Sequence, residues 1–134
     1  GADEVVNGRT SDPVAFVLEY TGGRGADVVF EAVGATDPIK TAIGCVRKGG
    51  TVTLIGNIRP TIELPLQPVV TREIRVQGSC ASSGEYPQCI ALMGKGAIDV
   101  SPMLTARAPL EEGARWFERL YSHEPNVMKV VLEP

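Results

Sequence analysis

The sequence is poor in the residue types that catalysis and metal binding commonly use. It has a single histidine, three cysteines and only 5% aromatic residues. Cys45, Cys80 and Cys89 are an odd number without a C-x-x-C spacing, so we expect neither a disulfide framework nor a zinc cage. We interpret them as small buried apolar residues. His123 lies in the polar segment YSHEPN, where a surface position is favoured over an acid–base role.

Long apolar runs and a strong excess of charge are also missing. No run approaches the ~20 residues that a membrane helix needs, and no signal segment opens the chain. Charged residues make up 22% of the 134 positions, and the formal net charge is -3. This balance is typical of a soluble globular protein, and it favours neither a nucleic-acid nor a membrane partner. We expect a cytoplasmic protein. The most basic pair, Arg47-Lys48, is predicted at the end of a helix, where cations complement the helix dipole.

The phosphate-binding turn G-x-G-x-x-G is absent as well. Gly22-Gly23-Arg24-Gly25 is rich in glycine, but it follows a predicted helix and precedes a strand. Phosphate binding requires the reverse order, so this segment is interpreted as a helix-to-strand turn. The chain begins GADEVVNGRT, without an initiator methionine and with a strand almost at once. We therefore expect a piece of a longer protein.

What the sequence does contain is a regular alternation of strands and helices. Ser11 or Asp12 is expected to cap a first helix, and Thr36 a second one that ends at Gly49-Gly50. Further helices are predicted at Leu66–Thr71, Tyr86–Met93 and Leu110–Tyr121. The predicted strands are Asp3–Asn7, Asp27–Val33, Thr51–Ile55, Ile74–Gly78, Met103–Arg107 and Val127–Leu132. The β-α-β-α-β order of the first half predicts an α/β fold with a parallel sheet.

Three of these strands end on glycine or a small polar pair. The ends are Val33-Gly34, Ile55-Gly56-Asn57 and Gly78-Ser79. In open parallel sheets, ligands bind where loops leave the carboxyl ends of the strands. Glycine there permits a positive φ and lets another molecule approach the backbone closely. Each glycine can also be an ordinary turn residue, so both interpretations stay open at this point.

Several segments, taken in order, resemble the medium-chain dehydrogenase/reductase family. They are GADEVVN, GADVVFEAVG, VRKGGTVTLIG, LPLQPVVTREIRVQGSCASSGEYPQCIALMGKGAIDV, PLEEGARWFERL and VMKVVLEP. More narrowly, they are similar to zinc-dependent alcohol and polyol dehydrogenases of the sorbitol and galactitol-1-phosphate dehydrogenase kind. The resemblance implies a partial Rossmann fold, a doubly wound parallel sheet lacking its first two strands. It implies that residues 1–134 are the C-terminal portion of a nicotinamide-cofactor-binding domain, with the catalytic zinc domain absent.

The same resemblance implies NAD or NADP as cofactor and roles for the strand ends. Val33 and Gly34 would face the ribose and nicotinamide, while Ile55, Gly56 and Asn57 would contact the nicotinamide through their backbone. Gly78 and Ser79 would lie near the carboxamide or the substrate mouth. Lys129 falls where the family commonly places a basic residue toward the pyrophosphate; a solvated lysine on an edge strand is the alternative.

No catalytic residue and no metal ligand can be transferred to this chain, because the family's zinc ligands and proton relay belong to the other domain. Cys80, beside Ser79, has no histidine partner in the sequence nearby and is not expected to be a nucleophile. The parent enzyme would act on a small alcohol or polyol with zinc, and the isolated piece is expected to be catalytically silent. A non-enzymatic assembly module and a piece of a zinc-free quinone reductase are the alternatives.

The predicted sheet also has an exposed edge. Without its first two strands, the sheet would leave Asp27–Val33 unpaired on one side, and an apolar edge of this kind invites pairing with another chain. The resemblance adds that intact relatives dimerise through the strand corresponding to Ile74–Gly78. We therefore expect a homo-oligomer.

Overall fold

The computed structural model describes residues 1–134, which divide into two compact units, Gly1–Ala81 and Ser82–Pro134. None of the helices has both the length and the apolar character needed to span a bilayer.

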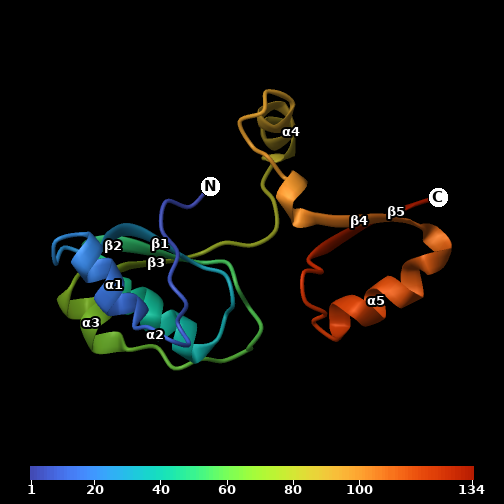
Figure 1. The fold of residues 1–134 in the computed structure, drawn as a ribbon. Coiled ribbons are helices and arrows are strands. Elements are labelled where there is room, and N and C mark those ends of the chain that lie inside the picture. The colour runs from blue at the N-terminus through green and yellow to red at the C-terminus, as the bar shows by residue number, and fades with distance from the viewer. The chain divides into compact units, whose positions relative to one another are not determined.

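The first unit is an α/β layer built on a parallel sheet. Its elements are α1 (Pro13–Tyr20), β1 (Ala26–Glu31), α2 (Thr36–Cys45), β2 (Val46–Leu54), α3 (Leu66–Thr71) and β3 (Arg75–Gly78). The strands lie in the order β1-β2-β3 and both pairings are parallel. Figure 1 shows α1, α2 and α3 on the same side of this sheet. The predicted α/β class and parallel sheet are confirmed, and α3 has the predicted bounds.

The first helix begins as the sequence indicates. Asp12 is its N-cap, and one carboxylate oxygen accepts hydrogen bonds from the backbone N–H groups of Val14 (2.8 Å) and Ala15 (3.3 Å). Pro13 at the first helical position lacks an N–H that would otherwise need a partner. Gly22 follows the helix with φ of 61°, a left-handed conformation that glycine adopts without strain.

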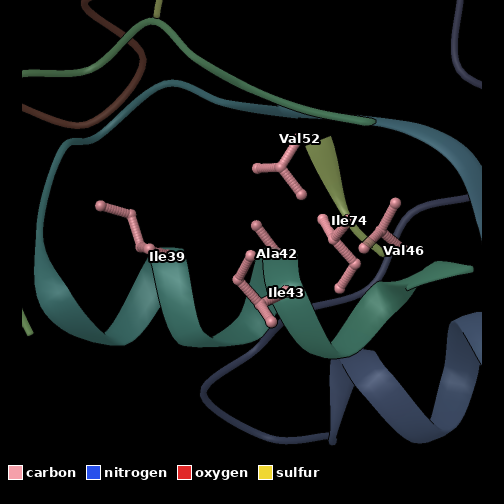
Figure 2. Packing of buried hydrophobic residues seen from close by; sticks show 6 residues of the cluster. All are labelled: Ile39, Ala42, Ile43, Val46, Val52 and Ile74. Carbon is pink, nitrogen blue, oxygen red and sulfur yellow. The ribbon is translucent and has the colours of Figure 1, made fainter. Parts of the chain in front are cut away.

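The core of this unit lies between α2 and the sheet. Side chains from α2 point toward residues of β2 and the residue before β3 (Figure 2). Val46 and Val52 are fully buried, and Ile43 is 2% exposed. The other face of the sheet carries Val28 and Phe30, which are 49% and 69% exposed. The alternation along β1 therefore places one set of side chains in the core and leaves the other set uncovered.

The predicted strand at Asp3–Asn7 is wrong. These residues form no strand, and the first sheet has three strands with β1 at its edge. A short extended segment gains stability only by hydrogen bonding to a neighbouring strand. No strand of this unit pairs with Asp3–Asn7. The apolar pattern of that segment is therefore not enough to make it a strand of the sheet.

Two predictions about α2 are also wrong. Ala35, not Thr36, is the N-cap, and Thr36 instead accepts a hydrogen bond from the backbone N–H of Glu63 at 3.2 Å. The helix ends at Cys45, so Arg47-Lys48 lies in β2 and not at a helix terminus. The reason is that Val46 is buried in the core and Arg47 pairs with Asp27 of β1, which extends the strand back to the helix.

An ion-pair cluster closes the amino end of β1. Asp27 accepts two hydrogen bonds from Arg24, at 2.6 and 3.0 Å, and one from Arg47 at 2.6 Å. Hydrogen bonds from these two guanidinium groups lower the pKa of Asp27 to about 2. The carboxylate is exposed, so solvent screens the interaction.

Replacing Asp27 by asparagine should change how stability depends on pH. The carboxylate pKa is lower in the folded chain, about 2, than its ordinary value of about 3.9. Its contribution is therefore present above pH ~4 and is lost as the pH falls toward ~2. Between these limits we expect the wild type to lose more thermal stability than the Asp27→Asn variant, measured by circular dichroism. The exposed Asp3→Asn serves as control, and a wild-type-like acid profile for Asp27→Asn would contradict the expectation.

The second unit is a small layer of parallel strands and helix. Its elements are α4 (Tyr86–Gly94), η1 (Ser101–Met103), β4 (Leu104–Pro109), η2 (Leu110–Glu112), α5 (Gly113–Tyr121) and β5 (Lys129–Glu133). β4 and β5 pair in parallel. The guanidinium of Arg119 lies 4.0 Å from the centre of the Trp116 ring and makes two hydrogen bonds of 2.6 Å to Glu124. These contacts hold the C-terminal end of α5 to the turn that follows it.

Candidate functional site at the strand ends

The carboxyl ends of the three parallel strands stand in one row. Glu31 of β1 pairs with Leu54 of β2, and Leu54 pairs with Gly78 of β3. The chain beyond each of these residues leaves the sheet at the same edge. We call this edge the strand-end rim and define it by the residues singled out from the sequence: Val33, Gly34, Ile55, Gly56, Asn57, Gly78 and Ser79.

Two rim glycines, Gly34 and Gly56, lie where the loop after β1 packs against the loop after β2. Gly34 is buried with φ of 77°, and a Cβ placed on it would lie 2.3 Å from the backbone N of Asn57. A Cβ on Gly56 would lie 2.2 Å from the carbonyl carbon of Val33. Neither position has room for a side chain, because the two backbones pack directly against each other. The glycines at these positions are therefore explained by packing alone.

Backbone hydrogen bonds join the same two loops. The carbonyl oxygen of Glu31 accepts from the N–H groups of Ile55 (2.8 Å) and Gly56 (3.1 Å). Beyond that point, the N–H of Arg59 donates to the carbonyl oxygen of Gly34 at 3.1 Å. The loops after β1 and β2 thus form one hydrogen-bonded body.

The side chain of Glu31 is the part of this arrangement that sequence reasoning missed. It is 4% exposed, and its carboxylate accepts hydrogen bonds from the N–H groups of Val33 (2.7 Å) and Gly34 (2.9 and 3.0 Å). The available signal was one acidic residue at the end of an otherwise apolar strand.

The third strand end differs from the first two. A Cβ placed on Gly78 would meet no atom within 4 Å, and φ at Gly78 is not positive. Ser79 is exposed and donates its backbone N–H to the carbonyl oxygen of Leu54 at 2.9 Å. Nothing within the chain therefore requires glycine at position 78.

The rim presents apolar side chains and open backbone to solvent. Val33, two residues after the end of β1, is 47% exposed, and Ile55, directly after β2, is 50% exposed. An apolar pair beside exposed Asn57 and Ser79 is suited to a flat ring that carries a polar group at its edge. By this chemistry the residues present fit the nicotinamide side of a dinucleotide cofactor.

An open hollow of about 430 Å³ lies along β1 and α2. Val33 of the rim lines it, together with Glu31 and residues of α2 such as Thr41. The hollow therefore reaches the rim at its β1 end and extends along the edge strand of the sheet.

Two further residues considered as functional from the sequence, Lys129 and His123, lie far from the rim residues along the chain. Lys129 is the exposed first residue of β5 and belongs to the second unit, so its role toward a pyrophosphate stays a prediction. His123 is an exposed residue after α5. Its backbone φ of 53° places it in a turn, in agreement with the surface position predicted.

The cysteines do not form a metal site. Cys80 and Cys89 are exposed, which corrects the expectation that all three are buried, while Cys45 is buried. Cys80 and Cys89 lie in a loop and a helix without a covering layer, so their apolar character does not bury them. Burial raises the pKa of the Cys45 thiol. No group of three or more His, Cys, Asp or Glu side chains is arranged to hold a metal ion, so the residues present do not fit zinc.

Comparison with known proteins finds zinc-type dehydrogenases among the relatives of this chain. A family model described as "Zinc-binding dehydrogenase" matches residues 1–95. D-arabitol-phosphate dehydrogenase from Enterococcus avium is 32% identical over 135 residues, which is 99% of this chain and 38% of that protein. The chain spans about 38% of the length of the curated relatives it matches.

Solved structures agree with the sequence matches. The alcohol dehydrogenase from Thermus sp. ATN1 has a TM-score of 0.84 at 28% identity, covering 96% of this chain and 38% of that one. A protein from Sinorhizobium meliloti 1021, described as a zinc-binding dehydrogenase and solved bound to NADP, has a TM-score of 0.85 at 26% identity. That match covers 100% of this chain and 40% of the other. The matched proteins carry the Rossmann type of fold expected from the sequence.

Proposed function

Because this chain belongs to the zinc-binding dehydrogenase family, we propose that its strand-end rim holds the nicotinamide side of NAD or NADP. In such enzymes the nicotinamide ring accepts or donates the hydride, and the protein supplies binding and orientation. Residues 1–134 would then be the C-terminal portion of the cofactor-binding domain. Val33 and Ile55 would cover one face of the ring, while Asn57 and Ser79 would bind its carboxamide.

The observation that carries this proposal is the glycine at position 78. Gly34 and Gly56 are needed by their own packing, whereas a side chain at position 78 would meet nothing in this chain. A glycine that the fold does not need, placed at the carboxyl end of a parallel strand, suits a site where another molecule approaches the backbone.

Titration with NADH tests the proposal. We expect a saturable change in nicotinamide fluorescence with the wild-type chain. The Gly78→Ala variant should bind NADH about fivefold more weakly, equivalent to roughly 1 kcal/mol, because the added methyl group occupies the ring site. Its unfolding free energy should match the wild type, since the new Cβ has open space around it.

The same titration separates this proposal from an assembly module. A module whose rim glycines are only turn residues would give no saturable signal with NADH. Lys129→Ala provides a further comparison: weaker binding would support the proposed contact with the pyrophosphate, and unchanged binding would support a solvated lysine on the strand.

The substrate belongs to the whole protein, and for it we propose a small alcohol or polyol. The names of the relatives support this class, D-arabitol phosphate among them. The residues of this chain supply no metal ligand set, so none of the roles proposed here depends on zinc. We propose that the chain alone binds cofactor without turning over an alcohol.

We further propose that the chain forms a homo-oligomer in the cytoplasm. β1 and β3 are both edge strands, and Phe30 on β1 is 69% exposed. Such edges favour pairing with a second copy. Free thiols at Cys80 and Cys89 suit a reducing compartment. Light scattering should give a mass above that of the monomer, and a monodisperse monomer at micromolar concentration would refute the oligomer.

A further inference from the structure

We propose that Glu31 is the positioning residue of the rim, whose buried carboxylate holds the loops after β1 and β2 in the arrangement that receives the nicotinamide. This inference rests on the proposed function for its ligand. Its structural part stands on contacts within the chain.

Glu31 binds both loops from one position. Its carboxylate accepts the N–H groups of Val33 and Gly34, while its backbone carbonyl accepts those of Ile55 and Gly56. Since Gly34 packs directly on Gly56, fixing the first turn also fixes the second. Val33 directly precedes Gly34, and Ile55 directly precedes Gly56. The placement of their exposed side chains therefore depends on the contact between the two glycines.

The chemistry of the side chain suits this task. Glu31 is the one buried charged residue of the chain, and it takes part in no ion pair. All its side-chain hydrogen bonds come from backbone N–H donors, to which its carboxylate oxygens are acceptors. Hydrogen bonds to a buried charge are stronger than those between neutral groups, and losing one leaves the buried partner unsatisfied.

Glutamine at this position is the informative substitution. Glu31→Gln keeps the shape and one acceptor oxygen, but its amide NH₂ would face the N–H of Gly34, which is itself a donor. The turn should then open locally while the core of β1 and β2 stays formed. We expect the backbone amides of Val33, Gly34 and Arg59 to exchange hydrogen about tenfold faster or more in the variant.

The experiment combines this exchange measurement with NADH binding on the full chain. By NMR, the Gly34 amide proton should also move upfield in Glu31→Gln, because an NH₂ group replaces one of the two oxygens that accept its hydrogen bond. The NADH dissociation constant should rise about tenfold at a temperature where the variant is fully folded. Ile43→Val is the matched control: it loosens the core without touching the rim, so these amides and NADH affinity should stay as in the wild type.

Each outcome decides a different point. Unchanged exchange in Glu31→Gln, or faster exchange spread evenly over β1 and β2, overturns the positioning role. If the wild type binds NADH and Glu31→Gln binds it equally well, the positioning role fails and the proposed function stands. If the wild type binds no NADH, the proposed function fails, and the amide exchange still decides whether Glu31 holds the loops.

Discussion

Replacing Gly34 by alanine is expected to destabilise the first unit by about 3 kcal/mol, or to prevent it from folding. An L-residue in the left-handed conformation costs roughly 1–2 kcal/mol, and φ at Gly34 is 77°. The new Cβ would also lie 2.3 Å from the backbone of Gly56 and Asn57. Backbone cannot move aside as a flexible side chain can, so overpacking adds about 1–3 kcal/mol. Urea unfolding followed by circular dichroism measures the loss.

Gly78→Ala is the matched control for this prediction. It introduces the same methyl group at the end of a neighbouring strand, where φ is not positive and no atom lies within 4 Å. Its unfolding free energy should stay within about 0.5 kcal/mol of the wild type. A Gly34→Ala variant as stable as Gly78→Ala would mean that the two loops do not pack as described.

Truncating Ile43 to alanine is expected to cost about 3 kcal/mol of unfolding free energy. Ile43 is 2% exposed and lies on α2 facing the sheet, among Val46, Val52 and Ile74 (Figure 2). Removing three buried carbons loses their transfer free energy and leaves a cavity in a core that includes only six buried residues. Thermal unfolding should show a correspondingly lower midpoint.

Ile58→Ala is the matched control, because it makes the same isoleucine-to-alanine truncation at an exposed position. Ile58 is 72% exposed, so its truncation should change the unfolding free energy by less than about 0.5 kcal/mol. Equal losses for Ile43→Ala and Ile58→Ala would contradict the placement of the core between α2 and the sheet.

Local patterns predicted most of the first unit. A cap at Ser11 or Asp12 and a helical turn at Leu66–Thr71 follow from signals within a few residues, and the structure has the cap at Asp12 and the turn as predicted. The strand predicted at Asp3–Asn7 fails because pairing depends on a neighbour that no local pattern reveals. Arg47 was assigned to a helix end for a similar reason: its partner, Asp27, lies twenty positions earlier.

The candidate site was predicted as a row of strand ends, and the register of β1, β2 and β3 places those ends side by side. What the sequence could not distinguish is why each glycine is there. Gly34 and Gly56 are glycine because they meet each other, and Gly78 is not constrained in this way. Glu31 escaped notice for the same reason, because its partners are backbone N–H groups whose positions depend on the folded loops.

NMR mapping of NADH on the isotope-labelled chain tests the central claim most directly. If the strand-end rim holds the nicotinamide, the amide shifts that change on titration should concentrate at Val33, Asn57 and Ser79, with the central strand β2 nearly unaffected. Changes that fall elsewhere, or no saturable change at millimolar NADH, would contradict the assignment of the rim as the cofactor site.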